Sequence, residues 1–154
     1  MTKNNLFAAA AGLAMMALSY GATAQTLLSG EAELRQKQEQ QFQAMFDQPE
    51  DLDLMFAYAL ISIQLKDFEA AISTLDRMLI FNPALVRVRL ELAAAYFRIG
   101  SYPIARHYFT QVIDDPEAED ALKARANEFL DVIDQRTRQN YVTGVVAANA
   151  IFTT

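Results

Sequence analysis

Few residues in this chain could support catalysis or bind a metal. His107 is the only histidine, and the 154 residues include no cysteine. Protein zinc sites need about three or four ligands of the Cys, His or carboxylate type, and an activated nucleophile needs a base beside it. One histidine completes neither set. We therefore interpret His107 as an exposed helical residue and predict no catalytic residue, no bound metal and no cofactor.

Acidic residues gather at Asp114-Asp115 and between Glu117 and Asp120. Paired carboxylates can act in acid–base catalysis or hold a cation. Acids are also favoured at the start of a helix, where the helix dipole stabilises negative charge. We interpret these acids as helix-start residues. The chain also lacks a phosphate-binding glycine loop and a nucleophile elbow, so we predict that the protein is not an enzyme.

An internal repeat predicts the elements of this chain. The stretch from Leu92 to Pro116 predicts two short helices with a turn at Gly100, and matching residues lie 34 positions upstream. The matched pairs are Ala59 and Ala93, Leu65 and Ile99, Phe68 and Tyr102, Ala71 and Ala105, Leu75 and Phe109, and Met78 and Val112. A period of ~34 residues is typical of tetratricopeptide repeats, whose helix–turn–helix units bury their apolar faces by stacking.

The repeat predicts an all-α fold, an α-solenoid fragment with a capping helix. The domain is expected over residues 49–138, with repeats at 52–82 and 85–115 and the capping helix at 117–136. The repeat signature residues are Ala59, Phe68, Ala71, Leu75, Pro83, Ala93, Tyr96, Gly100, Tyr102, Ala105, Phe109 and Pro116. Asn82-Pro83 and Asp115-Pro116 each predict a helix cap followed by proline at the first helical position. Gly100 is expected in the left-handed conformation that ends a helix.

Residues 1–24 have the features of a secretory signal peptide. Lys3 precedes an apolar run, and small residues end the segment at Ala24, before Gln25. The run is shorter than the ~20 residues that a membrane-spanning helix needs, which favours cleavage over anchoring. Cleavage would place the chain in the periplasm and, by removing Lys3, lower the net charge from −6 to −7. That sign argues against nucleic acid as a partner.

The segments that flank the repeats differ from them in character. Residues 25–48 are polar and carry only a thin apolar stripe that includes Phe42, Met45 and Phe46, so we expect an exposed leading helix, weakly packed on the first repeat, or a linker. Residues 139–154 form a strand-like tail. From Tyr141 to Thr154 the tail is uncharged and alternates between apolar and polar residues. Such a strand would pair with a partner, be disordered, or begin a longer structure.

The order of several motifs resembles a known family over residues 52–154. The motifs are Arg89-Leu90-Glu91-Leu92-Ala93, Tyr96-Phe97-Arg98-Ile99-Gly100-Ser101-Tyr102, Ala105-Arg106, Phe129-Leu130, Ile133, Arg136 and Arg138, and the change of pattern at Tyr141. Together they resemble the N-terminal part of the surface lipoprotein assembly modifier family. Its members are outer-membrane proteins with a periplasmic tetratricopeptide domain and a β-barrel, and they help to move lipoproteins or secreted proteins to the cell surface. The resemblance implies an outer-membrane β-barrel after the helices, or as a partner.

Stacked hairpins also predict a binding groove, because their first helices line the concave side. Helical spacing from Ala59 and Ala93 places eight side chains in this predicted groove: Phe56, Leu60, Ile63, Arg87, Leu90, Ala94, Phe97 and Arg98. The alternative is that the apolar members are covered by the leading helix or belong to the core. An open groove would hold a peptide by its apolar side chains, with the two arginines on an acidic group.

Two functions are consistent with these features. The first is a non-catalytic periplasmic protein–protein interaction module, which docks a substrate or partner for an outer-membrane lipoprotein or protein export or assembly system. The second is a free-standing, soluble periplasmic tetratricopeptide scaffold or adaptor. Both predict a protein or peptide partner, and neither predicts a nucleic acid or a small-molecule substrate.

Overall fold

The computed structural model describes the backbone of residues 30–151 and the side chains of residues 30–139. The predicted signal peptide, with its cleavage site at Ala24 and Gln25, lies outside the described residues. Residues 152–154 at the end of the predicted tail also lie outside them.

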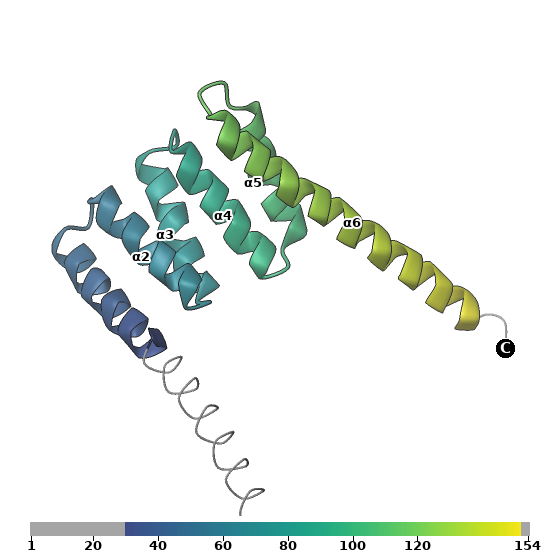
Figure 1. Ribbon diagram of the computed structural model, residues 1–154, viewed down its shortest axis with the longest axis horizontal. Helices are drawn as coiled ribbons and strands as arrows, with labels where there is room; N and C mark the ends of the chain where they lie inside the picture. Colours follow the sequence, from purple (N-terminus) through teal and green to yellow (C-terminus); the bar gives the residue numbers. More distant parts are fainter. Residues whose placement is uncertain (1–29, 152–154) are drawn as a thin grey trace, which may run out of the picture.

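Six helices account for most of the described backbone, which contains no strand. A leading helix over residues 30–47 is followed by α2 (Leu52–Gln64), α3 (Phe68–Phe81), α4 (Val86–Arg98), α5 (Tyr102–Asp114) and α6 (Asp120–Ile151). From α2 to α6, each helix packs against the next in chain order (Figure 1). The all-helical fold class is confirmed, and the arrangement is consistent with an α-solenoid.

The 34-residue repeat is visible in the backbone hydrogen bonds of two turns. After α2, the N–H groups of Leu65, Lys66 and Asp67 donate to the carbonyls of Ile61, Ile63 and Ser62, at 3.0, 3.1 and 2.9 Å. After α4, the N–H groups of Ile99, Gly100 and Ser101 donate to the carbonyls of Ala95, Phe97 and Tyr96, at 3.2, 3.1 and 2.9 Å. Lys66 and Gly100 both have positive φ, at 61° and 80°. Each helix therefore ends in the same left-handed cap, which is closed by a hydrogen bond between residues five positions apart.

The core consists of two hydrophobic clusters. We call the first the methionine cluster; it is formed by Met45, Met55, Ala59, Leu75, Met78, Val88 and Leu92. The second, the aromatic cluster, is formed by Leu90, Ala93, Ala94, Ala105, Phe109, Val112, Ala126 and Ile133, with Phe97, Tyr102 and Phe129 packed against it. The signature residues with no exposed surface are Ala59, Ala71, Leu75, Ala93, Ala105 and Phe109. The four alanines among them have small side chains, which allow the helix backbones to approach closely.

The signature prolines do not start helices. Asn82 ends α3, and its side chain accepts a hydrogen bond of 3.0 Å from the N–H of Ala84, so α4 begins only at Val86. Asp115 likewise ends α5, and α6 begins at Asp120, beyond Pro116. The prediction of proline at the first helical position is therefore wrong at both sites. In each case the polar side chain preceding proline caps a tight turn, as Asn and Asp commonly do.

The strand predicted from Tyr141 is also wrong as far as Ile151, because α6 is one helix of 32 residues. It begins at Asp120, not at residue 117, and continues far past residue 136. Extending an existing helix adds one hydrogen bond per residue, whereas a lone strand has no partner for its backbone. The alanines after Gly144 also favour the helix. Among the described residues, no helix is long and apolar enough to cross a bilayer.

Candidate functional site

The predicted groove divides between core and surface. Leu90 has no exposed area and Ala94 is 8% exposed, and both lie in the aromatic cluster. Leu90 therefore has no surface for a partner, and Ala94 has little. Phe56, Leu60 and Ile63 are half-buried along α2. The core alternative therefore describes Leu90 and Ala94, while the α2 residues keep accessible surface.

Phe97, another member of the predicted groove, is partly covered by α6. Its ring meets Phe129 edge to face, with centroids 5.2 Å apart. The Arg136 guanidinium lies 5.1 Å from the Phe97 centroid and donates a 2.8 Å hydrogen bond to the hydroxyl of Tyr102. The capping helix therefore closes this end of the predicted groove with an aromatic and cationic contact.

The two arginines of the predicted groove lie on the surface of α4. Arg87 and Arg98 are exposed, and the Arg87 guanidinium lies over the Phe56 ring at 5.4 Å from its centroid. Within the described residues neither arginine forms an ion pair; the arginines that do are Arg35, Arg89, Arg106 and Arg125. We call Phe56, Leu60, Ile63, Arg87 and Arg98 the α2–α4 face. It combines a half-buried apolar row with two cationic groups that have no acidic partner among the described residues.

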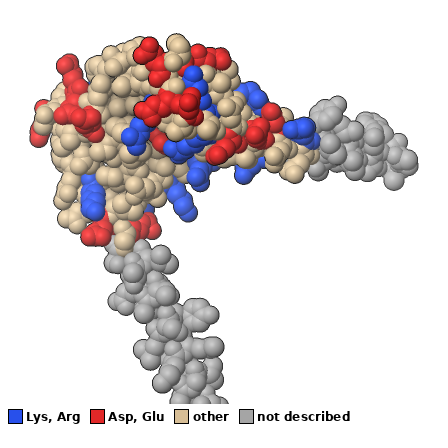
Figure 2. Space-filling model, turned by 45° about the horizontal axis from the view of Figure 1, so that its top comes forward, with Lys and Arg blue, Asp and Glu red and all other residues tan. Residues whose placement is uncertain are grey.

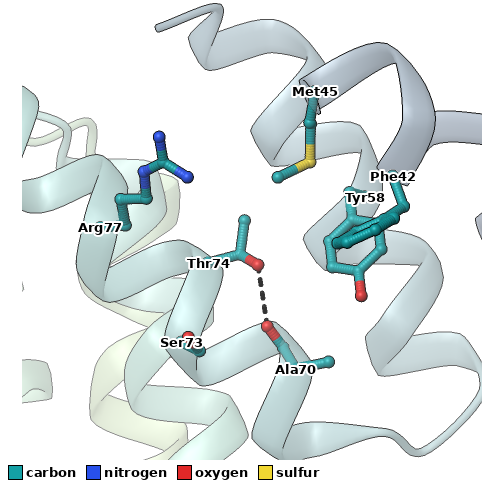
Figure 3. Close-up of a pocket in the computed structure, with 7 residues that line it drawn as sticks. All are labelled: Phe42, Met45, Tyr58, Ala70, Ser73, Thr74 and Arg77. Carbon is teal, nitrogen blue, oxygen red and sulfur yellow. Dashed lines mark hydrogen bonds between the residues drawn. The ribbon is translucent and has the colours of Figure 1, made fainter. Parts of the chain in front are cut away.

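A cavity lies on another side of α2 (Figure 3). Its volume is about 220 Å³, and it is lined from the leading helix, α2 and α3 by Phe42, Met45, Tyr58, Ala70, Ser73, Thr74 and Arg77. We call it the Arg77 cavity. Tyr58 is two residues from both Phe56 and Leu60, which places it ~200° around the helix from each of them. The cavity therefore shares no residue with the predicted groove and opens on a different surface.

Three contacts fix the walls of the Arg77 cavity. The Phe42 and Tyr58 rings pack at 6.0 Å between centroids, tilted by 46°. The Thr74 hydroxyl donates to the Ala70 carbonyl at 2.9 Å. Arg77 donates to the Pro49 carbonyl at 3.0 Å and lies 5.6 Å from the Phe81 ring centroid. The walls are therefore apolar on the side of the leading helix and polar along α3.

The leading helix is attached to α2 more firmly than the sequence predicted. Met45 is 8% exposed within the methionine cluster, and the Gln38 side-chain amide donates a 2.9 Å hydrogen bond to the hydroxyl of the buried Ser62. The stripe containing Phe42 and Met45 is evident in the sequence, but the cavity is not. Its other wall comes from α3, about 30 residues along the chain, so no local periodicity could indicate it.

A polar cluster that the sequence did not predict joins three helices. The hydroxyls of Tyr96 and Tyr108 donate to the two carboxylate oxygens of Asp76, at 3.3 and 3.5 Å, and the two rings stack at 5.9 Å. Burial raises the pKa of Asp76, an effect opposed by the two tyrosine hydrogen bonds. Burial, together with the negative charge of Asp76, raises the pKa of both tyrosines. This cluster joins α3 to α4 and α5 across the boundary between repeats.

The acids near residue 115 stabilise the loop after α5. Asp115 forms a 3.0 Å ion pair with Arg89, and its carboxylate accepts a 2.9 Å bond from the N–H of Glu117. The hydrogen bond from Arg89, followed by the one from Glu117, lowers the pKa of Asp115. His107 is exposed on α5, with Nε2 2.8 Å from the side-chain nitrogen of Gln111.

Charges of both signs are mixed over the molecular face shown in Figure 2, so the excess of acidic residues does not make that face uniformly negative.

No protein-family model, curated protein or solved structure matches this chain. Any function must therefore be argued from the surfaces themselves.

Proposed function

We propose that this chain is a non-catalytic protein-interaction module that docks a segment of a partner protein on the α2–α4 face. One observation carries the proposal. Arg87, whose guanidinium lies over the Phe56 ring of the half-buried row, is exposed, as is Arg98 about three turns further along the same side of α4, and neither has an acidic partner in the described part of the chain. A peptide with apolar and acidic side chains would cover that row and pair with both guanidinium groups.

The finer form of the proposal is a tetratricopeptide solenoid that works in the periplasm. The repetition of three turn hydrogen bonds at an offset of 34 residues supports the tetratricopeptide assignment. The signal-like sequence of residues 1–24 supports export. The resemblance to the surface lipoprotein assembly modifier family supports docking for an outer-membrane export or assembly system.

The helical backbone of α6 favours the second setting, a free-standing periplasmic scaffold. The strand expected from Tyr141 was the feature that connected the chain to an outer-membrane barrel, and the backbone is helical from there to Ile151. The mass and cell-envelope fraction of the native protein separate the two settings. A species near the mass of residues 25–154 in the soluble periplasm supports the scaffold, whereas a larger species held in the outer membrane supports the export system.

Site-specific photo-crosslinking tests the docking face. We expect a photoreactive residue at Leu60, in the native protein in its own cells, to give a discrete cross-linked partner band. The band should be lost in the charge-reversed variant Arg87→Glu/Arg98→Glu. The matched control places the same photoreactive residue at Ala121, which is exposed on α6, and should give no such band. A Leu60 band that is unchanged by the double charge reversal would contradict the proposed role of the arginines.

A further inference from the structure

The Arg77 cavity is large enough to take a side chain. Its volume of about 220 Å³ exceeds the ~150 Å³ of an apolar protein cavity that holds benzene. Figure 3 shows Arg77 on one side and the Phe42 and Tyr58 rings on the other, with Met45 and Thr74 between them. One large apolar side chain could enter between these walls and remain next to the guanidinium.

Exposed hydrophobic residues are concentrated on two of the three helices that line this cavity. Four of the seven large exposed hydrophobics among the described residues lie on the leading helix and on α3: Phe42, Phe46, Ile80 and Phe81. Phe46 and Ile80 are each 80% exposed. Phe46 lies one turn from Phe42, and the α3 pair lies one turn from Arg77, so the spacing places them at the cavity rim. Such a concentration marks a contact surface.

Arg77 supplies the charge at this surface. It uses one N–H for the Pro49 carbonyl, and it forms no ion pair with any described residue. A guanidinium has five N–H donors, so several remain for a ligand. Its position over the Phe81 ring holds it at the edge of the apolar rim. An acidic group is the chemistry that matches these donors.

We propose that the Arg77 cavity is a second peptide-docking site, separate from the α2–α4 face. It takes one large apolar side chain of a partner peptide and pairs Arg77 with an Asp or Glu side chain within one turn of it. Phe42, Phe46 and Ile80 cover the flanking apolar residues of that peptide. This site does not depend on the proposed docking function of the α2–α4 face, because the two surfaces share no residue.

The test begins by selecting random 12-residue peptides, displayed on phage, against the native protein. Selected peptides are synthesised with amidated C-termini, and their affinities are measured by fluorescence anisotropy. We expect a class of peptides that combine an aromatic or aliphatic residue with Asp or Glu. For this class, Arg77→Glu should weaken binding tenfold or more, and Arg77→Lys should weaken it less. Ser73→Trp, at an exposed position on the cavity wall, should block binding by filling the space.

The matched control is Arg87→Glu, a charge reversal on the other surface. It should leave binding of this peptide class unchanged, and circular dichroism should show that every variant keeps its helical content. Replacing the peptide acid by its amide should lose affinity with the native protein and lose none with Arg77→Gln, because the pair is already broken.

Other outcomes overturn the inference. If every selected peptide is lost with Arg87→Glu and retained with Ser73→Trp, docking occurs only on the α2–α4 face, and the second site does not exist. If binding needs a free C-terminal carboxylate and not the acidic side chain, the assignment of Arg77 to an Asp or Glu is wrong. If every selected peptide loses affinity with Ser73→Trp and Arg77→Glu and none does with Arg87→Glu, the Arg77 cavity is supported as a docking site and the α2–α4 face is not.

Discussion

The methionine cluster and the aromatic cluster hold their helices together by different means. Met45, Met55 and Met78 supply three of the seven buried residues of the first cluster. In the second, the fully buried Phe109 stacks on Phe129 at 4.8 Å, with the rings only 10° from parallel. Methionine has flexible rotamers and fills irregular space, whereas stacked rings permit few arrangements.

Ion pairs follow the same division. In the described residues, the ion pairs between separate elements all lie in the second half of the chain, which we take from α4 onward: Arg89 with Asp115, Arg125 with Glu91, and Arg106 with Asp134. The pair in the first half, Arg35 with Glu31, joins residues of one helix at 65% and 55% side-chain exposure. An exposed pair of that kind contributes little to stability, about 0.3–0.5 kcal/mol.

The two halves of the chain therefore differ in the contacts that hold their helices together. The second half is joined by stacked rings and by ion pairs between elements, whereas the core of the first half relies more on the adaptable packing of methionine. The first half also carries the Arg77 cavity and Phe46, the most exposed aromatic side chain among the described residues. Surfaces that must fit more than one ligand commonly use methionine for the same reason. We infer that adaptability is concentrated where docking is proposed.

Substitutions at fully buried core positions should give the largest effects on stability. Phe109→Ala removes a stacked ring from a site with no exposed surface and should cost about 3–5 kcal/mol in free energy of unfolding. Met55→Leu keeps the volume of an equally buried side chain and should cost less than about 1.5 kcal/mol. Urea unfolding followed by circular dichroism measures both. If Met55→Leu cost as much as Phe109→Ala, the first half would be as precisely packed as the second.

Exchange of the turn residues gives a smaller effect of opposite sign in the two repeats. Lys66 and Gly100 occupy equivalent left-handed positions, and an added Cβ at Gly100 would meet no atom within 4 Å. Backbone strain should therefore dominate. We expect Lys66→Gly to raise the free energy of unfolding by about 1 kcal/mol, and Gly100→Ala to lower it by a similar amount. Thermal unfolding of both variants checks this, and a decrease for Lys66→Gly would show that flexibility of the unfolded chain dominates.

The fold could be predicted where the 34-residue offset applied. That offset correctly placed the buried Ala59 and Ala93 and the left-handed Gly100, because each belongs to one repeated local unit. It did not indicate that Leu90 belongs to the core, since packing of α4 against later helices decides that. The strand predicted from Tyr141 is wrong because small residues such as Ala148 and Ala150 fit an alternating strand pattern as well as a helix.

The surfaces were less predictable, because each one combines residues from distant parts of the chain. The Asp76 cluster needs one residue from each of three helices, and the Arg77 cavity needs the leading helix against α3. Periodicity shows which face of a helix is apolar, but not which faces of different helices meet. Phe42 and Arg77 could therefore be noted separately but not paired.

The smallest expected effect on stability is a pH dependence. Two carboxylates, Asp115 and Asp76, should respond to pH in opposite directions. The pKa of Asp115 lies below its ordinary value of 3.8, so its stabilising contribution is present above that pH and is lost as the pH falls through the lowered value. The pKa of Asp76 lies above 3.8, so its contribution is present below that pH and is lost as the pH rises through the raised value. Acidification therefore reduces the cost of Asp115→Asn and increases the cost of Asp76→Asn.

Urea unfolding of the native protein and both variants at about pH 7 and pH 3 measures these changes. The cost of each substitution is the difference in free energy of unfolding from the native protein at the same pH, so the titration of all other acids cancels. The two costs should move in opposite directions between the two pH values. If they moved in the same direction, Asp76 would be stabilised as a charged group by its tyrosines. The boundary between the repeats would then be an anionic contact, like the ion pairs of the second half, and the contrast between the two halves would be smaller than their packing suggests.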